Sequence, residues 1–152
     1  MMILTEKERG LLNDMKSQEE LCIKKYEKYE REAKCPSLSG LFSTIKSAEC
    51  THLASVNSML SGNEPESPAP ISANNSEAVA CSYENQADKD ADCMLLSDML
   101  AMEKHVSALY NTGIFEFCSP KVRKMLNHIQ SEEQQHGEWM YAYMKANGMY
   151  NA

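Results

Sequence analysis

Two copies of the pattern Glu-x-x-His are the most chemically informative feature of this sequence. The pattern reads Glu-Cys-Thr-His at 49–52 and Glu-Gln-Gln-His at 133–136, and another glutamate, Glu19 or Glu103, precedes each copy by 30 residues. On a helix, residues three apart lie on one face about one turn apart, so the carboxylate and the imidazole of each copy face the same way. The sequence therefore predicts four carboxylates and two imidazoles that act together.

Metal binding is the chemistry that these six side chains predict. Two carboxylates 4 Å apart repel by about 4 kcal/mol at an effective dielectric constant of about 20, and in a core they need protons or cations to neutralise them. Mixed carboxylate and imidazole ligands favour iron or manganese, with zinc as a further candidate. The alternative is a polar layer without metal, kept neutral by protonation or hydrogen bonds. The predicted ligands of two divalent metal ions are Glu19, Glu49, His52, Glu103, Glu133 and His136.

An internal repeat supports this choice of ligands. A displacement of 84 residues aligns the first half of the chain with the second and gives 11 identities over residues 12–52 without a gap. Ordinary composition would give about two or three identities by chance. The glutamates Glu19 and Glu133 have glutamate counterparts in the other copy, whereas their neighbours Glu20 and Glu132 do not. We therefore prefer Glu19 and Glu133 as ligands.

Two tyrosines are shared by the copies as well. Tyr26 and Tyr110 follow Glu19 and Glu103 by seven residues, which is about two turns along the same helical face. We expect their hydroxyls to hydrogen-bond to the ligands from outside the inner coordination sphere, as is common at metal sites. The alternative is two core tyrosines that contribute packing alone.

Helices must position these residues, because apolar residues recur at helical spacing and strand signals are almost absent. A capping box at 5–8 begins the first helix, and a serine–proline pair at 119–120 begins the fourth. The first helical hairpin is predicted over about 5–62 and the second over about 90–148, with four helices of roughly 25–30 residues, or about 40 Å each.

The connection between the hairpins, about 63–89, is rich in proline, serine and asparagine. A simple up-down-up-down bundle needs only about 2–8 residues at this point. A connection of this length can return the chain to the far end of the bundle. The predicted fold is a single all-α domain: a ferritin-like four-helix bundle made of two duplicated hairpins joined by a long crossover linker.

Composition limits the classes of partner. A net charge of −7 disfavours nucleic acid and anionic membranes. No apolar stretch approaches the roughly 18 residues of a membrane span, and charged residues at 6–9 interrupt the apolar run that a signal peptide would need. We expect a soluble intracellular protein with no signal peptide and no membrane span that does not bind nucleic acid.

The six cysteines, at positions 22, 35, 50, 81, 93 and 118, show no Cys-x-x-Cys spacing. We expect six thiols that are mostly small buried hydrophobes, with cross-linking within an extracellular assembly as the alternative. His105 and His128 have no counterpart in the repeat and are expected at the surface or rim. The methionines are expected to fill the core.

The two Glu / Glu-x-x-His hairpins resemble the ferritin-like superfamily, including rubrerythrins and manganese catalases, and the Glu-x6-Tyr spacing resembles rubrerythrin in particular. The sequence is more closely similar to the coat F family of spore coat proteins. The segments that carry this similarity are LTEKERGLLNDMKSQEELCIKKYEKY, LLSDMLAMEKHVSALYNTGIFEFCSP and NHIQSEEQQHGEWMYAYMKANGMY. The resemblance implies a helical ferritin-like protein deposited in, or associated with, the spore coat, with other coat proteins or copies of itself as partners.

Two functions agree with these observations. One is a spore-coat-associated protein with a dinuclear carboxylate/histidine metal site. The other is a di-iron or di-manganese oxidoreductase that acts on peroxide or oxygen, which the intact set of six ligands favours. The sequence lacks the paired Cys-x-x-Cys motifs of a rubredoxin-like module, so electrons for such an enzyme would have to come from a separate partner.

Overall fold

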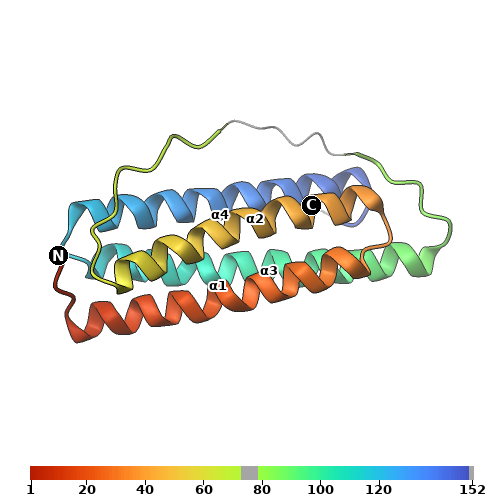
Figure 1. The fold of residues 1–152 in the computed structure, drawn as a ribbon. Coiled ribbons are helices and arrows are strands. Elements are labelled where there is room, and N and C mark those ends of the chain that lie inside the picture. Colours follow the sequence, from red (N-terminus) through yellow and green to blue (C-terminus); the bar gives the residue numbers. More distant parts are fainter. Residues whose placement is uncertain (73–78, 151–152) are drawn as a thin grey trace.

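The computed structural model of the chain describes residues 1–72 and 79–150, and within these residues it contains four helices and no strand. The helices are α1 (Glu6–Glu32), α2 (Pro36–Leu60), α3 (Gln86–Glu116) and α4 (Pro120–Ala146). They lie side by side as one elongated bundle (Figure 1). The prediction of an all-α protein with four long helices is confirmed. In the described part of the chain, no helix has the length and apolar character to cross a membrane.

The ends of two helices form as their sequences predict. At the start of α1, the Thr5 hydroxyl accepts from the Glu8 N–H at 3.1 Å and the Glu8 carboxylate accepts from the Thr5 N–H at 2.9 Å. At the start of α4, the Ser119 hydroxyl accepts from the Val122 N–H at 3.3 Å, with Pro120 as the first helical residue. These caps satisfy backbone donors that have no partner inside the helix.

The third helix begins earlier than the sequence analysis predicts. It starts at Gln86, four residues before the predicted start near 90. The cause is Asn85, whose side-chain oxygen accepts from the Asp88 N–H at 2.9 Å. Asparagine is a strong N-cap, and this signal lay inside the segment that we had assigned to the linker.

The order of the helices in space differs from that of a simple up-down-up-down bundle. α1 packs against α2 and α3 packs against α4, and the two hairpins meet through α1 with α3 and α2 with α4. α3 begins at the opposite end of the bundle from the end of α2 (Figure 1). Consequently α1 runs in the same direction as α4, and α2 in the same direction as α3, which is the connectivity of a bundle with one crossover.

The described parts of the linker are fastened to the bundle. Near its start, the Glu64 carboxylate lies 3.0 Å from the Lys121 ammonium group of α4. Near its end, the Cys81 N–H donates to the Asn147 side chain at 2.8 Å. Cys81 also forms a disulfide with Cys35, in the turn between α1 and α2.

The disulfide shows that the expectation of six thiols is wrong. Cys35 and Cys81 are 46 residues apart in the sequence, a separation that carries no pairing signal by itself. Of the four free cysteines, only Cys22 is buried, while Cys50 and Cys118 are exposed and Cys93 is half-buried. The disulfide lies within the chain, so it is not the cross-link between molecules that formed the alternative.

The core is apolar on both sides of a polar middle layer. On α1, Leu12 and Met15 precede Glu19, and on α4, Met140 and Met144 follow His136, and all five are buried. Apolar packing above and below this layer fixes the helices, so the polar side chains have little freedom to move apart. The fold thus holds a charged cluster where a bundle of this size would otherwise bury aliphatic residues.

Candidate metal centre

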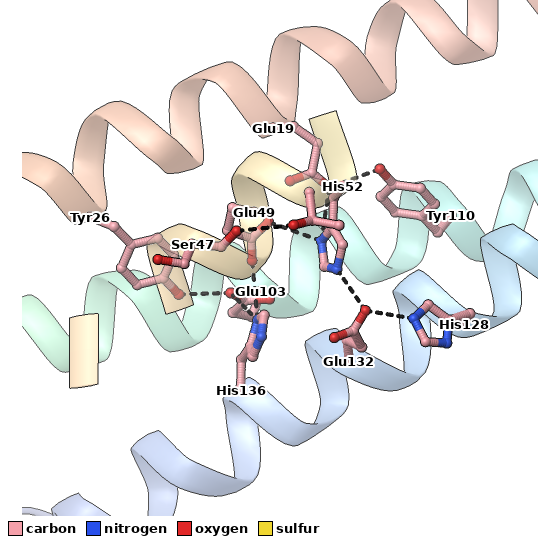
Figure 2. A network of polar contacts seen from close by, with 11 residues as sticks. Glu19, Tyr26, Ser47, Glu49, His52, Glu103, Tyr110, His128, Glu132 and His136 are labelled. Atoms are coloured by element: carbon pink, nitrogen blue, oxygen red, sulfur yellow. Dashed lines mark hydrogen bonds and ion pairs between the residues drawn. The ribbon is translucent and has the colours of Figure 1, made fainter. Parts of the chain in front are cut away.

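The six predicted ligand side chains lie in the middle of the bundle, and every helix contributes at least one of them. None is more than 4% exposed. Figure 2 shows five of them, from all four helices, converging on one region of the core. The six residues are Glu19 of α1, Glu49 and His52 of α2, Glu103 of α3, and Glu133 and His136 of α4.

The first group of donor atoms belongs to Glu19, Glu49 and His52, which we call the His52 half. His52 Nδ1 lies 3.3 Å from Glu49 Oε2 and 3.7 Å from Glu19 Oε1. One donor atom from each residue lies within 4.8 Å of the others. These distances leave space for one cation between two carboxylates and an imidazole nitrogen.

The second group belongs to Glu49, Glu103 and His136, which we call the His136 half. His136 Nδ1 lies 3.1 Å from Glu49 Oε1 and 3.3 Å from Glu103 Oε1. Its donor atoms also lie within 4.8 Å of one another. Glu49 offers one oxygen to each half, and the rings of His52 and His136 stack with centroids 6.0 Å apart. Glu49 is therefore placed as a bridge between two cation positions.

Glu133 belongs to neither group but lies close enough to feel their charges. Burial, followed by the charges of Glu103 and Glu49, raises the pKa of Glu133 to about 9. Both of its carboxylate oxygens are buried and neither has a hydrogen-bond partner. Buried carboxylate oxygens are normally satisfied, so this pair calls for a proton or a cation as its partner.

The other titratable groups of the cluster are coupled through Glu49. Burial and contact with Glu49 raise the pKa of Glu19 well above its usual range, and burial with the Glu49 charge raises the pKa of Glu103 to about 7. For Glu49, burial works against ionisation, but hydrogen bonds with Glu19, His136 and His52 hold the pKa well below its usual range. Burial works against the imidazolium of His136 too, but hydrogen bonds with Glu103 and Glu49 raise the pKa to about 9.

These shifts mean that protons supply positive charge to the cluster when no cation does so. A cation can replace them, because carboxylates and neutral imidazoles are the forms that bind metals. Oxygen and nitrogen donors of this kind suit iron, manganese and zinc. The donor set, its spacing and the unpartnered oxygens of Glu133 therefore fit two divalent ions.

The two shared tyrosines donate hydrogen bonds across the hairpins. The Tyr26 hydroxyl of α1 donates to Glu103 Oε1 of α3 at 2.7 Å, and the Tyr110 hydroxyl of α3 donates to Glu19 Oε1 of α1 at 2.8 Å (Figure 2). Each tyrosine thus fixes a carboxylate of the opposite hairpin. Such bonds orient a ligand and reduce its freedom before a metal binds.

Sequence reasoning missed Glu132, because it has no glutamate counterpart in the repeat. Its Oε1 lies 3.3 Å from His52 Nε2 and 2.8 Å from His128 Nε2, in the order that Figure 2 shows. A hydrogen bond at Nε2 leaves Nδ1 of His52 directed to the carboxylates. The place that the repeat assigns to Glu132 in the other copy is Ala48, so only His52 can be held by a carboxylate from this position.

The histidines outside the ligand set differ from each other. His105 is exposed, as expected. His128 is about 20% exposed at its side chain and bonded to Glu132, so it lies at the rim of the bundle. The sequence did carry a signal for this pair, since His128 and Glu132 are four residues apart on one helix and can therefore touch.

A pocket of about 410 Å³ between α3 and α4 reaches Glu103 and Glu133 from the surface. Ser107 of α3 and Gly137 of α4 contribute to its walls, and Tyr150 lies at its edge. The ring of Tyr150 meets that of Tyr141 edge-on, with centroids 4.8 Å apart. The pocket connects the buried carboxylates of the second hairpin with solvent.

Comparison with known proteins gives one match. No curated protein and no solved structure matches the chain significantly. Residues 91–152 match the family model of the Coat F domain, a spore coat protein family. This region contains most of α3 and all of α4, and with them three of the six predicted ligands: Glu103, Glu133 and His136. The second half of the chain is therefore similar to the Coat F domain.

Proposed function

We propose that this chain is a spore-coat-associated protein with a ferritin-like bundle whose core binds two divalent metal ions. The Coat F match over residues 91–152 supports the location. The crossover connectivity of the four helices and the repeat displacement of 84 residues support a ferritin-like bundle of two related hairpins. Other coat proteins or further copies of this chain are the proposed partners.

The observation that carries the metal proposal is Glu133 beside its neighbours. A carboxylate with two buried, unpartnered oxygens lies among three further buried glutamates, an arrangement that is unfavourable without added positive charge. Glu19, Glu49 and His52 would hold one ion, and Glu49, Glu103 and His136 the other. Glu133 would complete the set. We propose iron or manganese, with zinc as the third candidate.

Metal analysis of the purified chain tests this proposal. The chain is produced in cells supplemented with iron and manganese, and its metal content is compared with that of Glu49→Ala/Glu133→Ala. We expect about two metals per chain and a loss of both in the variant. Glu20→Ala is the matched control, because Glu20 is exposed and adjacent to Glu19.

A circular dichroism spectrum shows whether the variant keeps its helices, and Glu49→Gln/Glu133→Gln serves as a second variant of conserved volume. Removal of buried carboxylates relieves repulsion, so we expect both variants to fold. A metal content below about 0.2 per chain in the unaltered protein, unaffected by the substitutions, would refute the proposed metal site.

A second candidate function is an oxidoreductase that acts on peroxide or oxygen, and the pocket between α3 and α4 favours it. A centre that only stabilises the fold needs no route to solvent, whereas this pocket reaches Glu103 and Glu133. When bound, two redox-active metals would supply the electron exchange, and the protein would hold them and limit access. Peroxide consumption by the iron- or manganese-loaded chain distinguishes this function from a purely structural centre.

A further inference from the structure

The pocket between α3 and α4 is open because two small residues stand in its walls. Gly137 follows the ligand His136 directly, and Ser107 lies one helical turn after Glu103. A Cβ added at Gly137 would meet only the Leu100 Cδ1 atom, at 3.7 Å, which is ordinary van der Waals contact. A larger side chain at Gly137 would therefore extend into the pocket without displacing the backbone.

The other half of the repeat carries large residues at the same two places. The displacement of 84 residues pairs Ser107 with Ile23 and Gly137 with Leu53. Both Ile23 and Leu53 are half-buried. The two copies therefore share their ligands but differ in the side chains that would cover them.

The lining of the pocket indicates which molecules it suits. Leu100, Tyr141 and Tyr150 give it an apolar wall, and Lys104 and Glu138 add opposite charges where it opens. The carboxylates of Glu103 and Glu133 repel anions, so a small uncharged molecule is the favoured occupant.

We propose that this pocket is a port through which small neutral molecules, of the size of peroxide, dioxygen or nitric oxide, reach the His136 half of the centre. This inference rests on the proposed metal site for its biological meaning. The port itself depends only on access to the carboxylates of Glu103 and Glu133. Gly137 and Ser107 are its determining residues, since they keep the space free.

The first test measures access without any metal. The metal-free chain is treated with N,N′-diisopropylcarbodiimide, a small neutral reagent that converts accessible carboxyl groups to N-acylureas, and the modified peptides are quantified by mass spectrometry. We expect modification at Glu103 and Glu133, reduced at least about tenfold in Ser107→Ile/Gly137→Leu. These substitutions introduce the residues that the first copy carries.

The matched control is Ala101→Ile/Ser131→Leu, which adds similar volume at exposed positions on the same two helices. It should leave the modification unchanged. If Glu103 and Glu133 stay unmodified in the unaltered chain, or react equally in the pocket variant, the port is refuted.

The second test connects the port to the metals. The iron(II)-loaded chain is mixed with nitric oxide in a stopped-flow spectrometer, and the association rate is read from the appearance of the nitrosyl absorption. In Ser107→Ile/Gly137→Leu we expect an unchanged metal content and an association rate at least about tenfold lower. An unchanged rate would refute the port as the route to the centre.

The two tests also separate this inference from the function proposed above. Carbodiimide modification that the pocket variant abolishes, in a chain that binds no metal, would leave the port standing and refute the metal site. Two bound metals with a rate that the pocket variant leaves unchanged would support the metal site and refute the port.

Discussion

The His52 half and the His136 half of the centre offer the same donors, two carboxylates and one imidazole nitrogen, but in different surroundings. His52 is held from behind by Glu132, whereas the corresponding position for His136 is Ala48. The His136 half adjoins a pocket of about 410 Å³, whereas the first copy carries Ile23 and Leu53 at the equivalent places. One half is therefore braced and the other accessible.

This difference suggests how a duplicated hairpin can become specialised. The repeat supplies ligands in pairs, and substitutions beside the ligands then decide which half is rigid and which is reached from solvent. Glu49 joins the two, because it faces both histidines. The following predictions test whether the halves are unequal in this way.

The largest expected effect is the loss of both metals in Glu49→Ala. This substitution removes the one carboxylate that both halves share, so we expect affinity at each position to fall by more than about 100-fold. Glu19→Ala should weaken only the His52 half and leave about one metal per chain. Isothermal titration with manganese(II) measures both. Equal losses in the two variants would contradict a bridging role for Glu49.

Glu132→Ala is expected to weaken metal binding at the His52 half by about 10- to 100-fold, because His52 loses the group that orients its ring. Glu132→Gln keeps an oxygen acceptor for Nε2–H and should restore most of the affinity. The same titration, with two separate binding steps, provides the measurement. A loss at the His136 half instead would show that the brace has been assigned to the wrong histidine.

The metal-free chain should lose stability as the pH rises from about 6 to 9. Glu133, with a folded pKa raised to about 9, binds its proton more tightly in the folded state, so ionisation above its ordinary value disfavours folding. The stabilising contribution of protonated His136, whose folded pKa is about 9, is complete below about 6.5 and is lost over the same range.

Urea unfolding at several pH values measures this loss, which we expect to be at least about 2 kcal/mol. Glu133→Gln cannot ionise and should flatten the dependence, whereas Glu132→Gln should not, since the pKa of Glu132 is lowered by its hydrogen bond to His52. Stability that rises from pH 6 to 9 would contradict the burial of a neutral Glu133.

The smallest expected effects belong to the two tyrosines. Tyr26→Phe and Tyr110→Phe keep the packed ring and remove only the bonds to Glu103 and Glu19, at a cost of about 1–3 kcal/mol each. Urea unfolding of each variant measures the cost. Values below about 0.5 kcal/mol for both would favour packing as their sole contribution.

Much of the fold follows from helical periodicity and end signals. The cap at Thr5, the serine–proline start of α4 and the crossover connectivity rest on local sequence or on the length of one segment. The early start of α3 was missed because Asn85 lies in a polar segment with little apolar rhythm. The disulfide between Cys35 and Cys81 was missed because tertiary folding, not spacing, brings the two residues together.

The centre shows the same division. The three-residue spacing and the repeat indicated which side chains share a face, and five of the six lie in two compact groups. The repeat also directed attention away from Glu132, because agreement between the copies reveals what they share and conceals what distinguishes them. The pocket beside Gly137 depends on the absence of a side chain, which no pattern of functional residues can signal.

Anomalous diffraction from crystals of the manganese- or iron-loaded chain tests the central claim most directly. We predict two metal peaks about 3.5–4 Å apart in the middle of the bundle, one beside His52 and one beside His136, with Glu49 in contact with both. A core without metal, or ions found only at surface carboxylates, would contradict the account.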